Sequence, residues 1–253
     1  MATIITVTNQ KGGVGKTTTT SSLAVILKHK GYKVLAVDMD PQGNMSFCLG
    51  ADTVMNATIY DVLRGEIRPQ FAIQHTNTVD VIPSNILLSG IELEFTNMGR
   101  EYLLKSALNS IQQFYDYILI DTPPALSILT VNALVASTHV IIPMISDIFS
   151  IQGIVQLVES IGKVRELYNP ELVIGGVLMN KYNGRILLNK EVKGAAEKVF
   201  TDLEIPMFKA TIRNSIAIAE AQASQKDIVS YNPKNGIIRD YISLVSEMKE
   251  KGM

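Results

Sequence analysis

The stretch NQKGGVGKTTTTSSLA, residues 9–24, decides the fold, because it joins a glycine-rich turn to a helix-forming segment. It follows the apolar, β-branched run TIITVT at residues 3–8, which predicts a buried strand. A strand, a glycine-rich loop and a helix in this order form a cradle whose backbone N–H groups and helix dipole favour phosphate oxygens. The loop carries two lysines, Lys11 and Lys16, although one lysine is enough to hold a phosphate group.

Each residue of this P-loop, residues 9–18, has an expected part in nucleotide binding. Glycines allow the backbone to turn tightly and to approach the ligand closely. Lys16 is predicted to reach the β- and γ-phosphates, and the Thr17 hydroxyl to coordinate Mg²⁺. The predicted nucleotide-binding residues of the loop are Lys11, Gly12, Gly13, Val14, Gly15, Lys16, Thr17 and Thr18.

The loop departs from the general pattern G-x-x-x-x-G-K-[ST], because Gln10 stands where the first glycine is required. Its form K-G-G-x-G-K-T resembles the deviant Walker A family of P-loop ATPases, which includes the ParA partition ATPases, the MinD division-site proteins and the nitrogenase iron protein. The resemblance implies that Lys11 crosses a dimer interface and touches the phosphates of the partner's ATP. Formation of a homodimer would then be linked to ATP occupancy.

Two further motifs extend the resemblance. The stretch KVLAVDMDPQG, residues 33–43, resembles the family's second motif, which implies that Asp40 orients the attacking water and is catalytic together with Lys11 and Lys16. Asp38 is expected near Mg²⁺ or near the loop backbone. The stretch YILIDTPP, residues 117–124, resembles a Walker B strand, so Asp121 is expected to hold Mg²⁺ through a water. The prolines after it begin a segment expected to sense the γ-phosphate.

The rest of the chain predicts an α/β fold. Continuous apolar strands, each followed by a helix, indicate a mostly parallel sheet covered by helices on both faces. The sequence shows no linker or repeat, so residues 1–253 are predicted to form a single P-loop NTPase domain. Strands are expected at 3–8, 33–38, 79–84, 117–121, 139–144 and 172–180, helices at 16–29, 100–113, 126–136, 151–168 and 186–200, short surface helices within 42–75, and a docked helix at the C-terminal end.

The stretch MNKY, residues 179–182, bears on the choice of base. It resembles the guanine-reading N-K-x-D, but Tyr182 and Asn183 stand where the aspartate would have to be. Without that carboxylate the guanine donors lack an acceptor, so GTP is disfavoured and ATP is expected. Asn180, at a strand end, either hydrogen-bonds adenine or caps the loop.

The C-terminal third, residues 180–253, is the expected DNA-facing region. It holds 12 Lys/Arg and 9 Asp/Glu, a balance of +3, whereas residues 1–179 hold 11 and 15, a balance of −4. The segment IPMFKATIRNSIAIAEAQASQKDIVSYNPK, residues 205–234, resembles a segment of partition ATPases in which basic residues contact DNA without sequence preference. The candidates are Arg213, Lys234, Arg185 and Lys181, and for each of them a solvated surface position is the alternative.

Composition narrows the class of protein. The net charge of −1 excludes a globally basic nucleic-acid coat, and the single cysteine, Cys48, excludes both an internal disulfide and a subunit-bridging iron–sulfur cluster. The N-terminal stretch lacks the features of a signal peptide, which predicts a cytoplasmic protein. In the C-terminal segment acidic residues offset the basic ones, which argues against a membrane-targeting helix.

These features favour a partition ATPase, associated with the nucleoid and stimulated by a ParB-like centromere-binding partner. No glutamine or arginine finger is evident in the sequence, so slow intrinsic hydrolysis is expected. The rival hypothesis is a MinD-like ATPase that acts on a membrane or positions a protein cargo. The sequence does not separate plasmid from chromosomal DNA as cargo.

Overall fold

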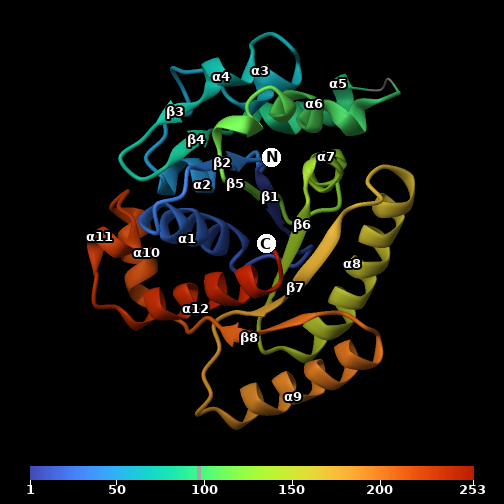
Figure 1. The fold of residues 1–253 in the computed structure, drawn as a ribbon, viewed down its shortest axis with the longest axis vertical. Helices are drawn as coiled ribbons and strands as arrows, with labels where there is room; N and C mark the ends of the chain where they lie inside the picture. The colour runs from blue at the N-terminus through green and yellow to red at the C-terminus, as the bar shows by residue number, and fades with distance from the viewer. Residues whose placement is uncertain (96–97) are drawn as a thin grey trace.

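A parallel sheet runs through the centre of the molecule (Figure 1), in a computed structural model that describes residues 1–95 and 98–253. Within these residues the sheet has eight strands in the order β3-β4-β2-β5-β1-β6-β7-β8, and β3 pairs antiparallel to β4 while the other pairs are parallel. The strands are β1 (Thr3–Val7), β2 (Val34–Asp38), β3 (Gln74–His75), β4 (Asp80–Ile82), β5 (Tyr117–Asp121), β6 (His139–Met144), β7 (Val173–Met179) and β8 (Met207–Thr211).

Helices cover both faces of this sheet, as predicted (Figure 1). The longer ones are α1 (Lys16–His29), α6 (Leu103–Asn109), α7 (Ile128–Ala136), α8 (Ile148–Leu167), α9 (Leu187–Asp202), α10 (Ile216–Ala223) and α12 (Gly236–Glu250). The shorter ones are α2 (Asn44–Cys48), α3 (Ile59–Leu63), α4 (Pro69–Ala72), α5 (Ile91–Glu94) and α11 (Ile228–Tyr231), with 3-10 turns at Ile86–Gly90, Arg100–Tyr102 and Gln112–Phe114.

The alternation of side chains along the strands explains the layers. Ile5 and Val7 of β1 pack with α1 and α12 on one face, whereas Ile4 packs with α3, α6 and α7 on the other. Because successive side chains of a strand point to opposite faces, a strand buried on both faces is apolar throughout. Helices α8 and α9 cover the outer strands β6 and β7 through a third cluster that includes Ile154 and Phe200.

Most predicted elements are present, but the sequence did not predict helices α5, α10 and α11, and further differences concern β3, β8, the helix expected at 100–113 and the start of α8. The sequence did not predict β3 or β8, and β8 is an edge strand with only one fully buried side chain. The helix expected at 100–113 is divided into α6 and two 3-10 turns. Helix α8 begins at Ile148, three residues earlier than expected. The expected short helices do occur within 42–75.

The C-terminal helix α12 lies beside α1 and β8, although α1 comes from the other end of the chain (Figure 1). Tyr241, Val245 and Met248 are buried against the core, as predicted from their helical spacing. Ile242, expected on the same face, is 37% exposed. The docked apolar face of α12 is therefore part of the core.

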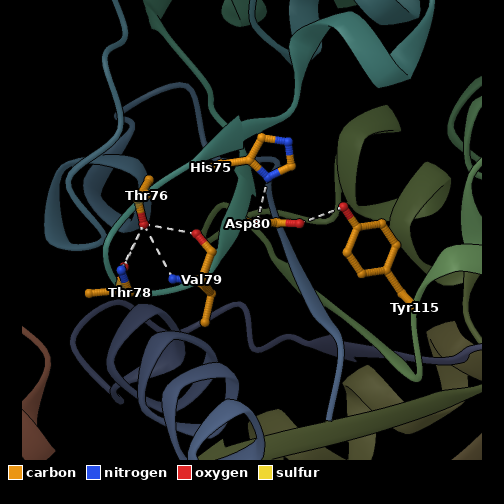
Figure 2. Close-up of polar contacts among 6 residues, drawn as sticks. All are labelled: His75, Thr76, Thr78, Val79, Asp80 and Tyr115. Carbon is orange, nitrogen blue, oxygen red and sulfur yellow. Dashed lines mark hydrogen bonds and ion pairs between the residues drawn. The ribbon is translucent and has the colours of Figure 1, made fainter. Parts of the chain in front are cut away.

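A polar cluster fixes the antiparallel edge of the sheet (Figure 2). His75 Nδ1 lies 2.8 Å from Asp80 Oδ1, and the Tyr115 hydroxyl donates to Asp80 Oδ2 at 2.8 Å. Burial, together with the bond to Asp80, raises the pKa of Tyr115. In the turn between β3 and β4, the Thr76 hydroxyl donates to the carbonyl of Val79 at 2.8 Å and accepts from two backbone N–H groups. The contacts tie the hairpin to the start of β5, away from the P-loop.

The carboxyl ends of the central strands meet at one edge. Asp38 at the end of β2 is the register partner of Asp121 at the end of β5, and Asp121 is also the partner of Val7 at the end of β1. The P-loop leaves β1 at this edge, which is the usual place for a ligand in an open parallel sheet.

Candidate nucleotide and magnesium site

The P-loop turns around left-handed glycines. Gly13 has φ 74° and Gly15 has φ 91°, a region that L side chains rarely adopt. A Cβ atom on Gly15 would lie 2.9 Å from Nδ2 of Asn180, so a side chain has no room there. Asn9 anchors the loop, because its Nδ2 donates to the carbonyl of Pro143 at 2.7 Å and its Oδ1 accepts from Lys11 N at 2.9 Å. The loop is therefore already shaped for close approach of a ligand.

Lys16 lies at the bottom of a cavity of about 390 Å³. Its side chain is buried, and its Nζ donates to the carbonyl of Lys11 at 3.3 Å. Burial lowers the pKa of Lys16, and the negative charges of Asp121 and Asp40 oppose that shift. The cavity residues are Gly12, Gly13, Gly15, Lys16, Thr17, Thr18, Asp40, Gln42, Asn44, Pro124 and Lys181.

The two predicted magnesium ligands are brought together. The Thr17 hydroxyl donates to Asp121 Oδ2 at 2.7 Å, and the Thr20 hydroxyl donates to Asp121 Oδ1 at 3.3 Å. Burial raises the pKa of Asp121, and so does the neighbouring charge of Asp38. A cation at this point would favour the ionised carboxylate, so the pair fits a metal ion.

The donor set fits Mg²⁺ in particular. In the described part of the chain no group of three or more His, Cys, Asp or Glu side chains could hold a metal by itself. Mg²⁺ commonly keeps several waters and binds through one or two protein oxygens together with substrate phosphates. Thr17 lines the phosphate cavity, and Asp121 is buried directly behind its hydroxyl, so the pair supplies such oxygens.

Asp38 holds the loop that follows β2. Its Oδ2 accepts from the backbone N and the hydroxyl of Ser46, at 2.8 and 2.7 Å, and its Oδ1 accepts from Asp40 N at 3.1 Å. Of the two positions expected for Asp38, the one observed is on the loop backbone. Burial raises the pKa of Asp38 to about 6, against the opposing effect of the bonds from Ser46.

Asp40 lies on the wall of the phosphate cavity. Its Oδ1 accepts from Gln42 N at 3.0 Å, so the carboxylate is oriented by its own loop. Pro124, in the segment expected to sense the γ-phosphate, lines the same cavity. The Thr122 hydroxyl in that segment donates to the carbonyl of Val7 at 3.0 Å, which connects it to β1.

Lys11 points away from Lys16 and forms an ion pair with Asp147. Its Nζ also lies 3.4 Å from the hydroxyl of Ser150. The hydrogen bond from Lys11 lowers the pKa of Asp147, whose other oxygen caps α8 by accepting from Phe149 N at 3.0 Å. Sequence reasoning missed Asp147, although a polar residue shortly after the end of β6 is the kind of signal that could have identified it.

Asn180 joins the P-loop to the end of β7. Its Nδ2 donates to the carbonyl of Val14 at 3.0 Å and to the Thr19 hydroxyl at 2.9 Å. Its Oδ1 is buried and has no hydrogen-bond partner among the described residues. Asn180 lines a second cavity of about 220 Å³, whose wall also contains Ile212, Ile218 and Ile237. The amide therefore caps the loop, which is one of the two positions expected for it.

The four predicted DNA-binding residues do not share one surface. Lys181 lines the phosphate cavity, and its Nζ donates to the carbonyl of Gly13 at 3.0 Å. It shares the second cavity with Arg213 but not the hollow that Arg185 lines. Arg185 and Arg213 line a separate hollow of about 470 Å³ together with Asp240. The Arg213 guanidinium makes two 2.7 Å bonds to Asp240. Lys234 is exposed between α11 and α12 and does not line that hollow.

Comparison with known proteins identifies the class. The family model described as an AAA domain matches residues 2–174. The sporulation initiation inhibitor protein Soj of Bacillus subtilis (strain 168) is 38% identical over 256 residues, with 100% of both chains covered. The chromosome partitioning protein ParA of Caulobacter vibrioides (strain NA1000 / CB15N) is 38% identical over 251 residues, with 97% of this chain and 93% of ParA covered.

A solved structure agrees with this match. The cobyrinic acid a,c-diamide synthase of Mycobacterium smegmatis with a bound ATP analog and magnesium has a TM-score of 0.81 and 34% identity, covering 88% of this chain and 92% of that one. The fold and the site define a P-loop ATPase with a second loop lysine. The chain belongs to the ParA and Soj family within the AAA domain group, which confirms the resemblance seen in the sequence.

Among the residues that the structure describes, none of the helices is both long enough and apolar enough to span a bilayer.

Proposed function

We propose that the protein is an ATPase of DNA partition, which binds ATP with Mg²⁺, dimerises on ATP, and in that state holds DNA without sequence preference. The observation that carries this proposal is a cavity lined by Lys16 and Thr17, with Asp121 buried behind the Thr17 hydroxyl and a second lysine, Lys11, at the same loop. Partition proteins such as Soj and ParA are full-length relatives, which supports the same role.

The second cavity supports adenine as the base. The free Oδ1 of Asn180 is an acceptor, which suits the amino group at position 6 of adenine. Guanine carries a carbonyl oxygen at that position, and two acceptors would face each other there. Since an unpaired buried polar group is costly, the cavity should select ATP over GTP.

The hydrolytic step needs positioning and charge neutralisation more than covalent chemistry. Lys16 and a partner subunit's Lys11 would supply positive charge to the phosphates, and Mg²⁺ would add charge through Thr17 and Asp121. Asp40, oriented by Gln42 N, would hold the attacking water. With no glutamine or arginine finger assigned, intrinsic turnover should be slow and should rise with a ParB-like partner.

DNA binding is proposed for the face that carries Arg185, Arg213 and Lys234. Arginine and lysine act there on phosphates, so the affinity should fall steeply with salt and should not depend on base sequence. Arg185 is exposed in the loop between β7 and α9, and no ion pair of its side chain is seen among the described residues. The DNA-bound protein would then be associated with the nucleoid in the cytoplasm.

The test is retention of a nonspecific duplex with ATP, with ADP and without nucleotide, at several salt concentrations. We expect the duplex to be retained only in the presence of ATP, and we expect this retention to be lost as the salt concentration rises. Lys16→Ala is the matched control, because it should remove the ATP effect. Equal retention in all three nucleotide states would refute the nucleotide-dependent cycle.

Two other functions are distinguished by separate measurements. A MinD-like protein would co-sediment with liposomes in ATP and would not bind DNA, although the apolar face of α12 is already buried in the core. An amidating synthase that generates ammonia with a cysteine would need an activated thiol. Burial raises the pKa of Cys48, the one cysteine of the sequence, to about 11, which argues against that chemistry.

A further inference from the structure

Lys181 has a backbone conformation that a lysine rarely adopts. Its φ is 52°, in the left-handed region that favours glycine. The conformation is imposed from both sides: Asn180 N donates to the carbonyl of Met144 at 2.7 Å, and Tyr182 N donates to the carbonyl of Ile212 at 2.9 Å. Glycine would satisfy the same turn without strain, so a lysine at this position calls for a reason in its side chain.

The side chain of Lys181 lies where the two cavities of the site meet. Lys181 lines both the phosphate cavity and the cavity that holds Asn180, and it shares this position with Gly15 and Thr18 of the P-loop. Its Nζ donates to the carbonyl of Gly13 at 3.0 Å, so the ammonium lies over the loop that would surround the phosphates. A nucleotide with its base in one cavity and its phosphates in the other must pass this side chain.

We infer that Lys181 is a nucleotide-positioning residue: its ammonium contacts the phosphate nearest the ribose, and its aliphatic stem packs beside the base. This inference rests on the proposed binding of ATP and adds a third lysine to the site. A lysine combines a mobile positive charge with an apolar stem, so it can serve both the charged and the uncharged part of the ligand. It also explains why Lys181 and Arg185, four residues apart, face different cavities.

The test separates the charge from the stem with two variants. Lys181→Met keeps an unbranched stem and removes the charge, whereas Lys181→Gly removes the whole side chain and relaxes the backbone. ADP and adenosine are titrated in competition with a fluorescent ADP analogue, since neither ligand requires a dimer. We expect Lys181→Met to weaken ADP about tenfold, as expected for a charge-assisted hydrogen bond, and to change adenosine less than about twofold.

Lys181→Gly should weaken both ligands, while its thermal midpoint without ligand stays equal to or above that of the parent. Lys190→Met, an exposed lysine of α9, is the matched control and should leave both affinities unchanged. ADP affinity of Lys181→Met within about twofold of the parent would overturn the inference. Lys16→Met separates this result from failure of the proposed function, because unchanged ADP affinity in that variant would refute phosphate binding at the P-loop itself.

Discussion

The Nζ atom of Lys11 lies in an ion pair with the carboxylate of Asp147, 136 residues later in the chain. Asp147 is also the N-cap of α8. The ion pair therefore holds the lysine at a helix N-terminus within its own subunit. The family resemblance assigns Lys11 to the partner's nucleotide, and the lysine must leave Asp147 to reach it. The ion pair would therefore compete with the proposed ATP dimer.

Removal of the charge on Asp147 should favour the ATP dimer. Asp147→Asn keeps an N-cap of similar quality for α8 and releases Lys11. Each partly exposed pair contributes about 0.2–1 kcal/mol and the dimer would break two of them, so the dimer association constant should rise about two- to thirtyfold. Sedimentation velocity in ATP measures it, with Glu159→Gln on the same helix as the control. A weaker dimer in Asp147→Asn would instead mean that Asp147 acts across the interface.

The two loop lysines should separate into two phenotypes. Lys16→Ala removes the buried amine at the bottom of the phosphate cavity, so nucleotide binding should be lost. Lys11→Ala leaves that cavity intact and should keep ADP binding while losing the ATP dimer and hydrolysis. Nucleotide titration and sedimentation in ATP give both results, and a Lys11→Ala protein that cycles normally would refute the role of this lysine.

Much of this site was predictable, because its central residues lie in short motifs at the carboxyl ends of predicted strands. The P-loop, Asp40 and Asp121 each follow a strand of continuous apolar residues, and parallel strands bring their carboxyl ends to one edge. The pairs that orient these residues were not predictable. Asp147 meets Lys11, and Ser46 holds Asp38, through contacts that depend on how separate loops fold.

The missed strand has a similar explanation. In β8 only Phe208 is fully buried, since the strand lies at the edge of the sheet. Its residues therefore do not form a continuous apolar run, and in the sequence they stand out only as part of the segment 205–234. Lys181 was assigned to DNA because it is basic and near Arg185. Its left-handed backbone, which turns it toward Gly13, leaves no mark in the sequence.

Asp40→Ala should produce a long-lived ATP dimer. The carboxylate lines the phosphate cavity without contacting Lys16 or Thr17 through any hydrogen bond given by the structure, so ATP binding should persist. Loss of the group that holds the water should slow hydrolysis by about 10²-fold or more. Dimer lifetime after dilution and phosphate release are the measurements. Rapid dissociation with normal phosphate release would remove Asp40 from the hydrolytic step.

The buried carboxyl of Asp38 predicts a pH-dependent stability. Its folded pKa of about 6 lies above the unfolded value, so its contribution to stability is fully present below about pH 4 and is lost as pH rises through about 6. Asp38→Asn cannot ionise. Between pH 5 and pH 8, without nucleotide or Mg²⁺, its free energy of unfolding should gain roughly 1 kcal/mol relative to the parent, since about one pH unit of the shift lies in this interval.

Urea unfolding of both proteins at the two pH values measures this change. Any destabilisation from weaker hydrogen bonds to Ser46 is the same at both pH values and cancels from the comparison. The control is Asp202→Asn, at the exposed end of α9. Parallel pH profiles for Asp38→Asn and the parent would show that the Asp38 carboxyl keeps an ordinary pKa.

The last prediction concerns the two arginines of the hollow beside β8. Arg185→Glu should weaken retention of nonspecific DNA in ATP by about tenfold at moderate salt and should lower the salt slope by about one, as expected for loss of one phosphate contact. Its thermal midpoint and ATP dimer should match those of the parent. Arg213→Glu should also weaken DNA binding and should lower the thermal midpoint, because its new charge faces Asp240, which now accepts two bonds from Arg213.

Arg213→Gln separates these two effects of Arg213, since it removes the positive charge without creating repulsion. If Arg213→Gln and Arg213→Glu both retain DNA as the parent does, Arg213 serves only to hold Asp240 and the start of α12. If Arg185→Glu retains DNA with an unchanged salt slope, the phosphate contact lies elsewhere. Lys234→Glu, in the exposed turn before α12, is then the next variant to measure.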